Sequence, residues 1–134
     1  MITLYLKLDE EFVKNVVGIR RWRTPNEEVE FEKIQEQLGH EKVDNGILYR
    51  FMFDNRYGAS VIKHEGSYGF DHDLWEVAVL YDDKLCYSTP VTCDVEGYCN
   101  DREVNRILHY LKNYDGKSDD EFEFRDEFYE EEEA

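Results

Sequence analysis

Four short apolar segments between residues 46 and 89 constrain the fold more than any other feature of the sequence. They are GILYRFMF (46–53), YGASVIKH (57–64), LWEVAVLY (74–81) and KLCYST (84–89). Within 74–81, two sets of side chains alternate with the period of a strand that has two different faces. The polar connections between the first two and the last two segments are short, as in antiparallel hairpins. The sequence therefore predicts neighbouring antiparallel strands.

The remaining regular elements are expected on either side of these strands. Residues 1–8 alternate apolar and polar side chains and predict a half-buried strand. Asp9 is a candidate N-cap for a short helix that carries an apolar stripe over 10–17. Capping signals and apolar spacings of three and four predict helices over 24–39 and 101–113.

The expected order is β-α-α-β-β-β-β-α, which indicates the α+β class. We expect an antiparallel sheet of four to five strands with two to three helices packed on one face. Residues 1–114 should form a single domain, in which 1–45 is a β-α-α part and 46–114 is a β-β-β-β-α core.

Residues 115–134 differ from the rest of the chain, since they contain eleven acidic and two basic residues. Like charges repel, and little apolar surface is available to hold such a segment down. We expect a disordered acidic tail. Phe122, Phe124, Phe128 and Tyr129 lie among the acids, a pattern typical of segments that become ordered on a partner.

The whole chain carries 32 acidic and 16 basic residues, and its formal net charge is −16. Such a field repels nucleic acid, which is bound through Lys and Arg, and attracts basic protein surfaces. The N-terminus has no signal-peptide pattern, and no apolar run approaches the length of a membrane span. We expect a cytoplasmic protein with no membrane contact and no direct nucleic-acid binding.

Two groups of residues are candidate metal sites. His64, Glu65, Asp71, His72 and Asp73 share one glycine-containing loop, but they follow no known metal-binding spacing, and a solvated polar loop explains them better. The cysteines at 86, 93 and 99 form no CxxC pair, so we expect three reduced thiols, no zinc and no other cofactor.

A small basic cluster lies at Arg20, Arg21 and Arg23 around Trp22. Basic residues with an interleaved aromatic are typical of nucleic-acid contacts. The alternative is that these arginines offset neighbouring acids while Trp22 packs in the core, and the negative field favours this alternative.

The core carries a resemblance. YGASV at 57–61, His64, SYG at 67–69, LWEVAVL at 74–80 and TPVTCDVEGY at 89–98 resemble a family of small, mostly uncharacterised tailed-bacteriophage proteins, over residues 50–113. The resemblance implies a phage protein with a compact αβ core. It implies no activity and no site residue.

No P-loop, GxGxxG, GxSxG or kinase signature is present, so a binding protein is favoured over an enzyme. The leading hypothesis is a phage-encoded inhibitor of a host nucleic-acid-handling protein, such as a restriction or CRISPR effector, whose carboxylates stand in for phosphates. The residues expected to bind this partner are acids of the 25–38 helix, of its flank and of the tail: Glu27, Glu28, Glu30, Glu32, Glu36, Glu41, Asp119, Asp120, Glu121 and Glu123.

Two other classes remain open. The first is a phage accessory or structural protein that assembles through the sheet, with an interface around Tyr57, Tyr68 and Trp75. The second is a small enzyme or metal-binding protein, which would need a cleft where His64, His72 and an acid converge.

Overall fold

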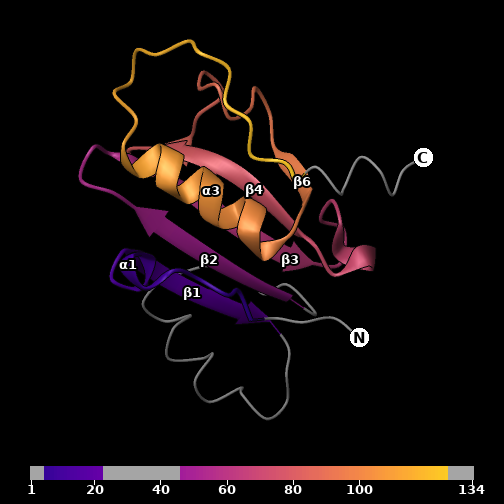
Figure 1. Ribbon diagram of the computed structural model, residues 1–134. Coiled ribbons are helices and arrows are strands. Elements are labelled where there is room, and N and C mark those ends of the chain that lie inside the picture. The colour runs from indigo at the N-terminus through magenta and orange to yellow at the C-terminus, as the bar shows by residue number, and fades with distance from the viewer. Residues whose placement is uncertain (1–4, 23–45, 127–134) are drawn as a thin grey trace.

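A six-stranded antiparallel sheet forms the centre of the part of the chain that the structure describes (Figure 1). The computed structural model describes residues 5–22 and 46–126, with the backbone alone at 19–22. The strands are β1 (Val16–Trp22), β2 (Gly46–Met52), β3 (Tyr57–His64), β4 (Trp75–Tyr81), β5 (Lys84–Leu85) and β6 (Glu96–Cys99). The helices are α1 (Glu10–Val13), the 3-10 turn η2 (Phe70–His72) and α3 (Asp101–Lys112). The predicted α+β class and antiparallel sheet are confirmed.

The strand order is β1-β2-β3-β4-β5, and β6 also pairs with β4. Tyr49 lies opposite Val61, and Val61 lies opposite Val77, so these side chains form one row across three strands. Directly opposed residues of an antiparallel sheet share a face. The alternation predicted from the sequence thus places one apolar face of the sheet toward the core.

Helix α3 lies across this apolar face (Figure 1). Its apolar stripe has the helical spacing of three and four and is fully buried, through Val104, Ile107, Leu108 and Leu111. Asn100 begins the helix with a capping box, in which its side chain accepts from the Glu103 amide and Glu103 accepts from the Asn100 amide. At the other end, the Asn55 amide donates to the carbonyls of Leu111 and Tyr114. The predicted helix 101–113 is therefore confirmed within one residue.

The N-terminal prediction is partly wrong. The helix after Asp9 covers Glu10–Val13 alone, and the valines expected to continue it belong to β1. Val16 and Val17 fit either period, and pairing with β2 decides in favour of the strand because β-branched side chains suit a pleated surface. Residues 5–8 lie outside any strand, although Leu6 is buried and its amide donates to the Tyr49 hydroxyl. The predicted helix 24–39 lies outside the described residues.

The predicted strand 84–89 is also too long, since β5 ends at Leu85. The edge of β4 beyond it pairs instead with β6, where Trp75 lies opposite Cys99. No sequence pattern predicts β6, because this strand is four residues long and contains Gly97 and a left-handed Tyr98 with φ of 56°. Strand β6 leads directly into α3 and so positions the site described next.

Candidate binding surface

The C-terminal segment, residues 115–126, packs on the fold. Phe124 is 6 % exposed and belongs to the main hydrophobic core, and Phe122 packs against that core. Figure 1 shows the segment leaving the end of α3 and returning toward β6. The prediction that the domain ends at residue 114 and a disordered tail begins there is wrong for 115–126. The prediction considered charge repulsion, but two phenylalanines supply enough apolar surface to pack the segment on the core. Residues 127–134 lie outside the described part.

A continuous series of aromatic rings connects this segment to the sheet. Neighbouring ring centroids are 4.1–5.8 Å apart, within the range in which aromatic pairs attract. The series runs through Tyr81, Tyr57, Tyr114, Tyr110, Phe122 and Phe124. Tyr57, predicted as part of an interface, is therefore half-buried against its own fold.

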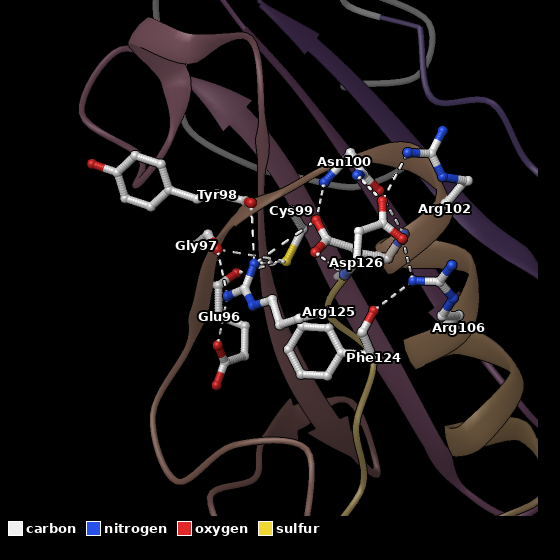
Figure 2. A network of polar contacts seen from close by, with 11 residues as sticks. Glu96, Gly97, Tyr98, Cys99, Asn100, Arg102, Arg106, Phe124, Arg125 and Asp126 are labelled. Atoms are coloured by element: carbon white, nitrogen blue, oxygen red, sulfur yellow. Dashed lines mark hydrogen bonds and ion pairs between the residues drawn. The ribbon is translucent and has the colours of Figure 1, made fainter. Parts of the chain in front are cut away.

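Asp126 ties the segment to the beginning of α3 (Figure 2). Its carboxylate accepts from Asn100 at 2.6 Å, from Arg102 at 2.8 Å and from Arg106 at 2.6 Å. Burial alone would raise the pKa of Asp126, but these three donors outweigh it and lower the pKa from 3.8 to about 2. The carboxylate also lies where a helix N-terminus favours negative charge.

Arg125 ties the same segment to β6. Its guanidinium donates to the Gly97 carbonyl at 2.9 Å, to the Tyr98 carbonyl at 3.1 Å and to Glu96 at 3.0 Å. The Asp126 amide donates to the fully buried Glu103, the residue that also closes the capping box. We call Arg125 and Asp126 the clasp, since together they join the segment to both β6 and α3.

Residues 119–123 carry four acids, Asp119, Asp120, Glu121 and Glu123, here called the acidic row. All four side chains are exposed. None forms an ion pair with the residues that the structure describes, whereas Asp82, Asp83 and Asp73 do, with Arg56, Arg50 and Lys63. The exposure alternates along the row, with Glu121 and Glu123 outward and Phe122 and Phe124 inward. The clasp and the phenylalanines thus present carboxylates that pair with no cation of the described residues.

The other acids predicted to bind a partner lie outside the described residues. They are Glu27, Glu28, Glu30, Glu32, Glu36 and Glu41. Arg20, Arg21 and Trp22 lie in β1, and Arg23 follows it outside the described part.

The predicted aromatic interface is not a single surface. Trp75 is 1 % exposed, and its indole donates to Asp101 at 2.8 Å. Tyr68 is exposed, and its neighbour in space is Tyr98, whose amide donates to the Tyr68 carbonyl at 3.2 Å. Sequence reasoning missed Tyr98, because no short-range pattern places residue 98 beside residue 68.

The loop 64–73 does not gather its histidines and acids. The Asp73 carboxylate pairs with the buried Lys63 at 2.8 Å, and the His72 ring lies against Tyr98. Within residues 5–22 and 46–126, no group of three or more His, Cys, Asp or Glu side chains is placed to hold a metal. The three cysteines are free thiols, and burial raises the pKa of Cys99 to about 12.

His109 has acidic partners that the sequence did not reveal. Its ring nitrogens lie 2.8 Å from Asp9 and 3.2 Å from Glu11, and Lys112 also pairs with Glu11. These contacts join α1 to α3 across about a hundred residues of sequence. Since both ring nitrogens face carboxylates, the arrangement holds two helices together.

Comparisons with protein-family models, curated proteins and solved structures found no match to this chain. No helix in the described ranges has the length and apolar character needed to cross a bilayer.

Proposed function

We propose that this chain is a binding protein that inhibits a nucleic-acid-handling protein by occupying its basic groove with the acidic row. The observation that carries the proposal is the combination of exposure and anchoring at residues 119–126. Four carboxylates without ion pairs among the described residues are held by two phenylalanines and the clasp. The formal net charge of −16 adds long-range attraction for a basic partner.

The spacing of the acidic row supports this proposal. From Asp119 to Glu123 the backbone spans at most about 14 Å, at ~3.5 Å per residue. One strand of a DNA duplex carries about one charge per 3.4 Å of axis, which gives about four charges over the same length. Four carboxylates on this segment therefore approach the charge density of a single nucleic-acid strand.

Anchoring favours binding as well as steering. A disordered acidic tail loses conformational freedom when it binds, and this loss offsets part of the attraction. Phe122, Phe124 and the clasp already restrict the segment in the free protein. The acidic row should therefore contribute to residence time and also to the association rate.

The resemblance to tailed-phage proteins supports placing the partner in a bacterial host, with the complex in the host cytoplasm. In this proposal the chain is phage-encoded, acts against a host defence such as restriction or CRISPR, and catalyses no reaction. The absence of catalytic signatures in the sequence supports the last point.

Two variants test the role of the acidic row. The row variant combines Asp119→Asn, Glu121→Gln and Glu123→Gln. The matched control combines Glu10→Gln, Asp54→Asn and Asp94→Asn, which are exposed acids elsewhere on the surface and remove the same charge.

Wild-type protein immobilised on a resin and incubated with bacterial lysate should retain a nucleic-acid-handling protein. Duplex DNA or RNA added to the resin should displace this partner. The row variant should lose this partner, and the matched control should keep it. Equal retention by both variants, or a partner that nucleic acid cannot displace, would contradict the proposal.

Self-assembly or assembly with another phage protein is the second candidate. It is favoured by the exposed Tyr68 and Tyr98 at one end of the sheet. Sedimentation over a wide concentration range checks the self-association form of this candidate, because dimers should dissociate on dilution.

A further inference from the structure

Two exposed tyrosines lie on neighbouring backbone segments next to the clasp, where the Tyr98 amide donates to the Tyr68 carbonyl. Tyr68 is 60 % exposed and Tyr98 is 39 % exposed. Each lies against a glycine beside the other: a Cβ on Gly97 would come within 2.3 Å of the Tyr68 Cβ, and a Cβ on Gly69 within 2.9 Å of the Tyr98 backbone. The SYG and EGY sequences thus interlock, and we call Tyr68 and Tyr98 the tyrosine platform.

The platform is held in a costly conformation. Tyr98 has φ of 56°, in the left-handed region that a bulky side chain rarely adopts because the conformation is strained. Arg125 donates to the Tyr98 and Gly97 carbonyls and fixes this conformation. In Figure 2 the Tyr98 ring points away from the clasp network. The fold therefore holds a strained residue whose ring is partly exposed and has the His72 ring on one side.

Acidic residues lie close to Tyr68, either in space or in the same loop. The Glu76 carboxylate accepts from the Tyr68 amide at 2.9 Å, so it lies next to this residue. Glu65 and Asp71 are exposed in the same loop as Tyr68, and they have no ion pair within the described residues. Exposed aromatic faces beside carboxylates suit a cation and repel a phosphate.

We propose that the tyrosine platform binds an arginine side chain of the basic protein whose groove takes the acidic row. The proposal rests on the function proposed above and names the residue type that the partner contributes. Arginine fits better than lysine, because its planar guanidinium stacks on aromatic rings while donating to a carboxylate in bidentate fashion.

The clasp makes the platform and the acidic row parts of one surface. Arg125 follows the last acid of the row by two residues, and its guanidinium donates to the backbone carbonyls of Gly97 and Tyr98. A basic groove that lies along residues 119–123 would therefore reach β6 and the platform at its end. Tyrosine and arginine are also the side chains that dominate binding energy at protein interfaces.

The test uses two probes of equal charge, deca-arginine and deca-lysine peptides, titrated against the full chain. Wild type should bind deca-arginine about fivefold more tightly than deca-lysine, because one arginine side chain that stacks on an exposed aromatic ring adds an attraction of this size. Tyr68→Ala and Tyr98→Asn should each reduce that ratio toward one, chiefly by weakening deca-arginine binding. Asn is chosen at 98 because it tolerates the left-handed conformation. Tyr87→Ala is the tyrosine control. Tyr87 is 49 % exposed and follows β5, away from the platform, so its loss should leave the ratio unchanged.

The outcomes separate the two proposals. If the row variant loses affinity for both peptides while Tyr68→Ala keeps the wild-type ratio, the platform proposal is wrong and the acidic row stands. If the row variant and the matched control bind both peptides as wild type does, the proposed function is contradicted, and the platform proposal that rests on it is contradicted as well. If wild type dimerises and Tyr68→Ala is monomeric, the platform is a contact between copies, and the arginine proposal is overturned.

Discussion

Replacing Asp126 by Asn tests whether the clasp holds the C-terminal segment on the fold. The change keeps the size of the side chain and removes the charge that Arg102 and Arg106 share. A shift of the Asp126 pKa from 3.8 to about 2 corresponds to about 2 kcal/mol of stability. The two arginine side chains are 71 % and 43 % exposed, so solvent screening reduces the expected loss to about 1–2 kcal/mol.

The pH dependence has a defined sign. Folding lowers the pKa of Asp126, so its contribution is complete above the unfolded value of 3.8 and is lost as the pH falls through about 2. At pH 3 the contribution should be about half of that at pH 7. Urea denaturation of wild type and Asp126→Asn at both pH values measures this difference directly.

Asp119→Asn is the control, because it removes the same charge from an exposed side chain without an ion pair among the described residues. Its stability should stay within about 0.5 kcal/mol of wild type. The reasoning is refuted if Asp126→Asn is as stable as the control, or if its deficit is the same at pH 3 as at pH 7.

Three further predictions concern the packing of the same region. Phe124→Ala should cost about 3 kcal/mol in urea denaturation, since the ring is 6 % exposed in the main core. Iodoacetamide should alkylate the exposed Cys93 first and the half-buried Cys86 more slowly, and Cys99 should react only after unfolding, as peptide mass spectrometry will show. Asn55→Ala should lower the melting temperature by an amount equivalent to about 1–3 kcal/mol, because it removes the side-chain amide that caps the carbonyls at the end of α3.

Local signals predicted some elements well. The capping residue Asn100 and the apolar stripe of α3 lie within a dozen residues, so local sequence is sufficient to predict this helix. Strands β2, β3 and β4 were also predictable, since each is an apolar run of seven or eight residues bounded by turn residues, and a short turn joins β2 to β3. In β1, by contrast, the choice between helix and strand depends on the free edge of β2, which no local pattern contains.

The candidate site was less predictable because its contacts are distant in sequence. Arg106 meets the Phe124 carbonyl across 18 residues, and Arg125 meets Gly97 across 28. Read locally, residues 119–126 are an acidic run with two aromatics, and charge repulsion predicts a free tail. The sequence indicated which carboxylates to consider at 119–123, and their role in binding stays a prediction, but it did not indicate that the segment carrying them is anchored.

The acidic row is tested most directly by the salt dependence of deca-arginine binding to wild type, the row variant and the matched control. Titrations at ionic strengths between about 0.05 M and 0.3 M cover the range in which exposed charges become screened. At low salt the row variant should bind about tenfold more weakly than wild type, as expected for three lost exposed ion pairs, and the difference should shrink as salt rises. The matched control should stay within about threefold of wild type, since it loses the same long-range charge but no direct contact. Equal weakening of the two variants at every salt concentration would contradict the account, because only net charge, and not the anchored row, would then determine binding.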